Sequence, residues 1–137
     1  MEVNVWSVVV ATIAMFVVGA IWYMGPFAKA WGEIHGFNKI SKAKQKQMQA
    51  KMGPFYLAQI LVTVLSAWVL AVFIALLPDQ SPYSLALMIW LGFVLPPQVS
   101  GVIFGGTEPK FVIRKIAIMA GEALLHLEVA AFVISMM

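Results

Sequence analysis

The sequence predicts an all-α integral membrane protein, a four-helix bundle with a short interfacial amphipathic helix after the first span. The first observation is composition: 62% of the 137 residues are hydrophobic and only 11% are charged. This leaves too little charged surface for a soluble domain. The second observation is arrangement, because the apolar residues form long runs and the basic residues are confined to the segments between them.

Four apolar runs are long enough to cross a bilayer, at about residues 3–24, 55–77, 83–105 and 111–137. A helix rises about 1.5 Å per residue, so about 22 residues reach roughly 33 Å, the thickness of a hydrocarbon core. Lipid offers the backbone no hydrogen bonds, and each run is therefore expected to be helical. The polar turn LPDQSP should make the second and third spans a hairpin. Residues 1–137 are expected to form a single transmembrane domain.

The positions of the basic residues predict the orientation of the chain. All nine Lys and Arg fall in two short segments, residues 29–51 and 110–115, which follow the first and third spans. Basic loops remain on the cytoplasmic side, so we expect both termini outside the cytoplasm of a cell membrane. The N-terminus carries Glu2 and no basic residue, and we expect no secretory signal there.

The end of the first span has the composition of a membrane boundary. Trp22 and Tyr23 are expected at the inner interface, and an amphipathic helix at about 26–37, containing Trp31, should lie in the interface plane. A basic cytoplasmic loop at 38–53 follows. These features are either an aromatic anchor with a positive-inside signal or an anionic-lipid site. The loop lysines assigned to such a site are Lys42, Lys44 and Lys46.

This region also resembles a known family. The pattern G-x-x-W-Y-x-x-x-F-x-x-x-W, here Gly19, Trp22, Tyr23, Phe27 and Trp31, is similar to the first-span signature of a bacterial membrane family catalogued as domain of unknown function 1761. LGFVLPP (91–97) and IFGGTEPKF (103–111) resemble its third span and following loop. The resemblance covers nearly the whole chain. It implies four transmembrane helices and no established activity.

The fourth span departs from the mainly apolar sequence that the family implies, because it contains Glu122, His126 and Glu128. Such groups are costly in a bilayer unless they are paired, protonated or in contact with water. Glu122 and His126 are four residues apart and share one helix face. They form either a structural pair between helices or subunits, or a site that handles a proton or cation. A metal site would need ligands from a second subunit, and we expect none.

Polar and proline residues also interrupt the second and third spans. Gln59 and Thr63 lie on one face of the second span, where they either join helices or line a wet path. In the third span, Pro96 and Pro97 remove two backbone donors just before Gln98. This produces either a kink repaired by neighbouring side chains or a broken helix whose carbonyls and Gln98 line a small cavity.

Two further patterns concern helix packing. Gly101-x-x-x-Gly105 in the third span predicts a close approach to another helix. The pairs Ile21-Trp22 and Ile89-Trp90 each precede a proline. They are either a chance similarity between apolar helices or the remains of a parallel repeat of two helices.

Two functions are compatible with these residues. We expect a small transporter or channel-like protein for a proton, cation or small solute, using Glu122 and His126. The alternative is a structural or accessory protein that binds a partner subunit or anionic lipid. Motifs of soluble enzymes are absent, so we expect no enzyme, no cofactor and no nucleic-acid partner. With few polar groups per chain, a homo-oligomer, dimer or larger, is expected in the lipid bilayer.

Overall fold

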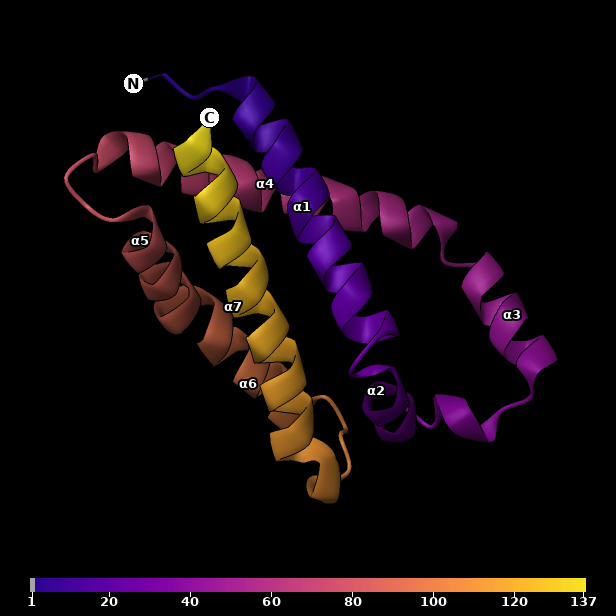
Figure 1. Ribbon diagram of the computed structural model, residues 1–137. Helices are drawn as coiled ribbons and strands as arrows, with labels where there is room; N and C mark the ends of the chain where they lie inside the picture. The colour runs from indigo at the N-terminus through magenta and orange to yellow at the C-terminus, as the bar shows by residue number, and fades with distance from the viewer. Residues whose placement is uncertain (1) are drawn as a thin grey trace.

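All regular secondary structure is helical in residues 2–137, the part of the chain that the computed structural model describes. The long helices are α1 (Val5–Met24), α4 (Gly53–Leu76), α5 and α6 (Pro82–Ile89 and Leu95–Phe104, joined by the π-helical turn η2, Trp90–Val94) and α7 (Val112–Met136) (Figure 1). Four helical segments are long and apolar enough to cross a membrane. The predicted all-α class and the four spans are confirmed, and the chain is a membrane protein.

Helix α7 lies at the centre of the bundle. It contacts α1, α4, α5 and α6, and Figure 1 shows it between α1 and the α5–α6 segment. Small residues make these contacts close, since Ala120, Ala123, Ala130 and Ala131 are all buried. In a bilayer, where lipid is as apolar as the helices, such close packing is a main source of helix association.

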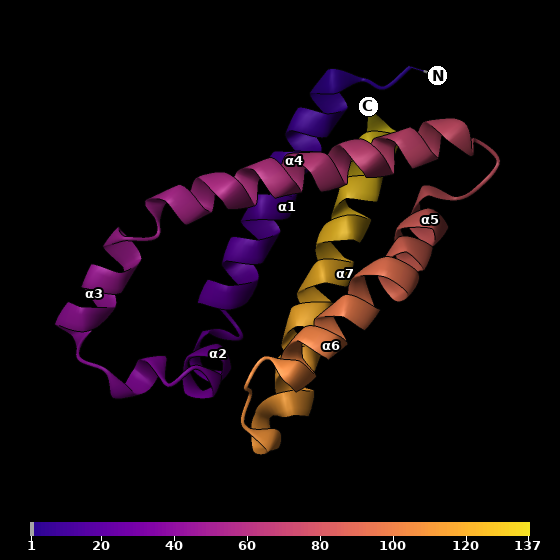
Figure 2. The same ribbon diagram turned by 180° about the vertical axis from the view of Figure 1, so that it is seen from behind.

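Helix α4 does not run alongside the other spans. Figures 1 and 2 show it lying across α1 and α7, steeply inclined to both. Its contact with the bundle is made by its middle, where Thr63, Ala67, Leu70 and Ala71 are buried. Every residue from 53 to 62 is exposed. The first part of α4 therefore extends beyond the bundle toward α3 (Lys42–Ala50).

Both termini lie at one end of the bundle. The side chain of Asn4 caps α1 by accepting hydrogen bonds from the backbone N–H groups of Trp6 and Ser7. The Asn4 amide also donates to the carbonyl of Met137, at 3.5 Å. The opposite end carries α2 (Ala28–Ile34) and the connection between α6 and α7 (Figure 1). The two basic segments therefore share one end, and the termini share the other.

The segment predicted as an interfacial helix at 26–37 is shorter than expected. Helix α2 covers only Ala28–Ile34, because Gly36 adopts a left-handed conformation (φ 68°) that ends it. The 3₁₀ turn η1 (Phe37–Lys39) follows. The basic segment after it is helical, and Ser41 caps α3 by accepting from the Lys44 N–H.

The third span is continuous, so of the two alternatives for Pro96 and Pro97 the broken helix is not found. The Leu95 N–H donates to the Trp90 carbonyl, so the chain widens into a π turn directly before Pro96 and Pro97. The prolines then occupy the start of α6, where missing N–H groups are best tolerated. The expected close approach at Gly101 is also wrong within this chain. A Cβ atom there would meet nothing within 4 Å.

The absence of cysteine allows a direct test of orientation. Asp79→Cys places one thiol in the exposed α4–α5 turn near the termini, and Lys46→Cys places one on exposed α3. Because basic loops remain in the cytoplasm, a membrane-impermeant maleimide should label the first variant in intact cells. It should label the second only after permeabilisation. The unaltered chain is the blank, and the reverse pattern would contradict the predicted orientation.

Candidate functional site

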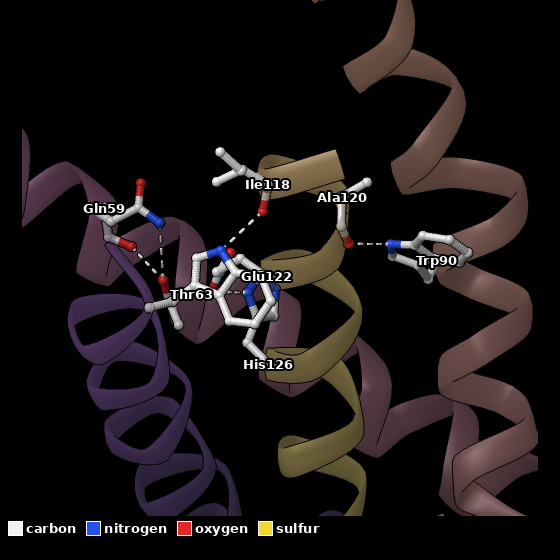
Figure 3. A network of polar contacts seen from close by, with 8 residues as sticks. Gln59, Thr63, Trp90, Ile118, Ala120, Glu122 and His126 are labelled. Atoms are coloured by element: carbon white, nitrogen blue, oxygen red, sulfur yellow. Dashed lines mark hydrogen bonds and ion pairs between the residues drawn. The ribbon is translucent and has the colours of Figure 1, made fainter. Parts of the chain in front are cut away.

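The pair of ionisable residues in α7 forms the centre of the site. His126 Nδ1 and Glu122 Oε1 are 2.9 Å apart, at hydrogen-bond distance, one helical turn from each other. Glu122 is only 9% exposed. Figure 3 shows both side chains on the side of α7 where Gln59 and Thr63 of α4 lie. Two of the three costly groups of the fourth span therefore satisfy each other.

A cavity of about 400 Å³ lies beside this pair, between α1, α4 and α7. Its polar lining residues are Glu122, His126, Gln59, Thr63, Tyr23 and Tyr56, and the others are apolar or glycine. The Thr63 hydroxyl donates to the Gln59 carbonyl at 2.6 Å, and the Gln59 amide lies 3.4 Å from the Thr63 hydroxyl oxygen. The predicted polar face of the second span thus meets the Glu122–His126 pair across a cavity.

Gly19 on α1 sets the space available to the Glu122 carboxyl. A Cβ atom on Gly19 would lie 3.2 Å from Glu122 Oε1. This is closer than such contacts normally come, so a side chain at Gly19 would displace the carboxyl. The glycine allows α1 to approach α7 at the level of the ionisable pair.

A second cavity, of about 360 Å³, adjoins His126 from another direction. Ser66 of α4 and Gln98 of α6 line it, together with apolar residues. Gln98 Oε1 is buried and has no hydrogen-bond partner within residues 2–137. His126 lines both cavities. The structure thus brings Gln59, Gln98, Glu122 and His126, four of the six residues predicted for a cavity, around two adjoining spaces.

Two tryptophans hold the backbone of α7 at the level of this site. Trp22 Nε1–H donates to the Ile118 carbonyl at 3.0 Å, and Trp90 Nε1–H donates to the Ala120 carbonyl at 2.8 Å. Figure 3 shows Trp90 reaching α7 on the side away from Glu122 and His126. Gly121 gives Trp22 its room, since a Cβ atom there would lie 3.1 Å from the indole ring. Together the two bonds fix the rotation of α7, which determines where Glu122 points.

Sequence reasoning missed this role. Trp22 was expected at the membrane interface, which stays a prediction, and its bond to the backbone of α7 was not foreseen. The available signal was the pair of Ile-Trp dipeptides, because Trp22 and Trp90 make the same kind of bond to the same helix. Whether they descend from a repeat or arose separately, they have equivalent contacts.

The remaining predicted residues lie outside the two cavities, except Tyr23. Tyr23 also packs on Trp31 with ring centroids 4.8 Å apart, and Trp31 packs on His35 at 4.3 Å.

Pro96 and Pro97 are exposed and line neither cavity, which differs from their expected role. Glu128 lines neither cavity. The α3 lysines Lys42, Lys44 and Lys46 are exposed. Within residues 2–137 no three His, Cys, Asp or Glu are grouped for a metal ion.

Comparison with known proteins identifies one family. The family model described as protein of unknown function (DUF1761) matches residues 6–135. The match includes all four spans, both tryptophans that hold α7 and the Glu122–His126 pair. No curated protein and no solved structure matches the chain. The family description assigns no activity, so the chemistry of the site has to be inferred from its residues.

We expect Trp22→Phe and Trp90→Phe each to lower the free energy of unfolding by about 1 kcal/mol, because each removes one bond between helices. Equilibrium unfolding with dodecyl sulfate in mixed micelles measures the change. Trp68→Phe is the matched control, since Trp68 is half exposed and its indole makes no such bond within residues 2–137. Equal losses in all three variants would show that the indole bonds contribute nothing specific.

Gly19→Ala should lower the free energy of unfolding by about 1–2 kcal/mol relative to Gly101→Ala. The reason is that the methyl group added at position 19 meets the Glu122 side chain, whereas the one added at position 101 meets nothing within 4 Å. The same unfolding assay applies. Adding Glu122→Asp, which shortens the carboxyl side chain, should reduce the cost of Gly19→Ala. Additive effects of the two substitutions would contradict direct contact between the two positions.

Proposed function

The chain belongs to the DUF1761 family of proteins of unknown function, and we propose that it is a small transporter or channel-like membrane protein whose Glu122–His126 pair handles a proton or small cation. One observation carries the proposal. The pair is hydrogen-bonded at 2.9 Å and borders two cavities, with His126 on the wall of both. A group that must pass between the two spaces would meet this pair.

The chemistry of the pair suits proton exchange. A carboxyl and an imidazole at hydrogen-bond distance can share one proton, and imidazole titrates near neutral pH when it is unperturbed. Imidazole also has two ring nitrogens, so it can accept a proton on one and release it from the other. His126 Nδ1 faces Glu122. Its second nitrogen remains for exchange with a cavity.

Oxygen atoms around the two cavities suit a proton carrier or a small hard cation. Gln98 Oε1 is buried without a partner within residues 2–137, and Thr63 contributes a hydroxyl on the other side. Oxygen ligands are those that hard cations prefer. A buried acceptor without a donor is costly in an apolar span, and a bound cation or hydrated proton would relieve that cost.

Orientation and assembly belong to the same proposal. With its basic end in the cytoplasm, the cavity beside Tyr23 would lie toward the cytoplasm. Residues 53–62 of α4 are exposed and mostly apolar. This supports a homo-oligomer, dimer or larger, in which a second copy covers the projecting part of α4.

An accessory function predicts a different environment for the Glu122 carboxyl. If the pair only joined helices, close-packed side chains should surround the carboxyl. Glu122 instead borders a cavity of about 400 Å³, which supports transport over structural packing. The observation that favours a docking role lies elsewhere, in the exposed α3 lysines Lys42, Lys44 and Lys46, which could meet anionic headgroups.

The proposal is tested with purified protein in liposomes that contain a pH-sensitive dye. A potassium gradient with valinomycin drives proton entry, and a sodium gradient with a sodium dye tests a cation. Glu122→Gln should reduce the flux at least about tenfold, because it removes the exchangeable charge while it preserves shape. Glu128→Gln, on the same helix but outside both cavities, should retain the flux.

Unfolding measurements on both variants separate lost flux from lost structure. Transport is refuted if the unaltered protein carries neither ion above empty liposomes. Equal losses in the two glutamine variants would show that flux does not pass through Glu122.

A further inference from the structure

A third cavity lies at the basic end of the bundle, away from the Glu122–His126 pair. Its volume is about 560 Å³, and it lies between the α2–η1 segment and the connection from α6 to α7. Its wall is mixed, and its polar residues include His35, Asn38, Lys39, Thr107, Lys110 and Lys115. Segments about 70 residues apart in the sequence thus build one polar site.

Glycine turns shape both sides of this cavity. Gly36 and Gly106 line it and have φ values of 68° and 77°, which other residues rarely adopt. A Cβ atom at either position would meet nothing within 4 Å. The glycines are therefore needed for the backbone conformation of the turns, and the turns leave the cavity open.

The charges on the wall leave two lysines without an acidic partner. Glu33 pairs with Arg114 at 2.8 Å, and Glu108 pairs with Lys110 at 3.5 Å. Lys39 and Lys115 form no ion pair within residues 2–137. The Lys115 ammonium lies 5.9 Å from the centre of the Trp31 ring, a cation–π contact that holds it beside the cavity. The site thus has an excess of positive charge after its acidic groups are paired.

One hydroxyl group on the wall is also unsatisfied. Thr107 Oγ1 is buried and has no hydrogen-bond partner within residues 2–137. Buried polar atoms are almost always hydrogen-bonded, so an exception in a polar cavity suggests an absent acceptor. An anion is the acceptor that two unpaired lysines and a hydroxyl donor would share.

We propose that this cavity binds a phosphate group, held by Lys39, Lys115 and the Thr107 hydroxyl. The group can belong to a phospholipid headgroup, because the site lies at the end of the spans, or to a soluble phosphate. The site is distinct from the α3 lysines, which are exposed and line none of the described cavities. The proposal is independent of ion transport at Glu122.

Native mass spectrometry of delipidated protein in detergent tests the site. The protein is titrated with phosphatidic acid, with phosphatidylcholine as the neutral comparison, and separately with inorganic phosphate. The double variant Lys39→Gln/Lys115→Gln should bind the anion roughly tenfold more weakly. The matched control, Lys29→Gln/Lys51→Gln, removes the same charge from two exposed lysines that line none of the described cavities, and it should change binding less than about threefold.

Thr107→Val supplies a second test that does not alter charge. It removes only the unsatisfied hydroxyl, so it should weaken anion binding about threefold or more. It should not lower the unfolding midpoint, because no bond within the described chain is lost. If Thr107 had only a structural role, Thr107→Val would lower the unfolding midpoint and leave anion binding unchanged.

The two titrations identify the source of the phosphate group. If inorganic phosphate does not displace bound phosphatidic acid, the site binds a lipid headgroup. If inorganic phosphate binds and competes with phosphatidic acid, the site binds a soluble phosphate. Either result supports the site. The proposal is overturned if both lysine pairs weaken binding equally, if the Lys39/Lys115 pair has no effect, or if phosphatidylcholine binds as well as phosphatidic acid.

Discussion

Two hydrogen bonds from indole N–H groups to the backbone of α7 determine much of this structure. A bilayer gives polar atoms no alternative partner, so the bonds from Trp22 and Trp90 persist only in one rotation of α7. That rotation places Glu122 between α1 and α4 and places the small residues of α7 against its neighbours. The centre of the bundle is thus ordered by directional bonds as well as by apolar packing, which alone would permit several rotations.

The position of the polar groups follows from the same constraint. Once α7 is fixed, Glu122 and His126 share a hydrogen bond and face the polar residues of α4 across a cavity. Gly19 permits this arrangement because a larger residue would meet the carboxyl. At the basic end, Glu33 and Arg114 join α2 to α7. Functional and structural interactions therefore converge on a single helix, which contacts every other span.

Local patterns in the sequence predicted the four spans, the shared face of Glu122 and His126, and the polar face of α4, because each depends on helical spacing alone. Features that depend on tertiary contacts were not predictable. An indole at a helix end is usually interfacial, and only the fold directs Trp22 to Ile118. The π turn directly before Pro96 and Pro97 was also not foreseen, because the sequence indicated only a repaired kink or a broken helix there. The cavity at the basic end joins Lys39 to Lys115, and no local pattern relates those positions.

The inclination of α4 leaves the first part of this helix without support from the bundle. Helix α4 contacts the bundle through Thr63, Ala67, Leu70 and Ala71, and residues 53–62, which precede this region, are all exposed. Gln59 lies one turn before Thr63 and lines the same cavity as Glu122. Swinging the start of α4 toward α1 would narrow the space between them, and swinging it away would widen that space. The segment from Gly25 to Met52 connects the end of α1 to the start of α4, so the length that this segment spans sets how far apart those two helix ends can lie.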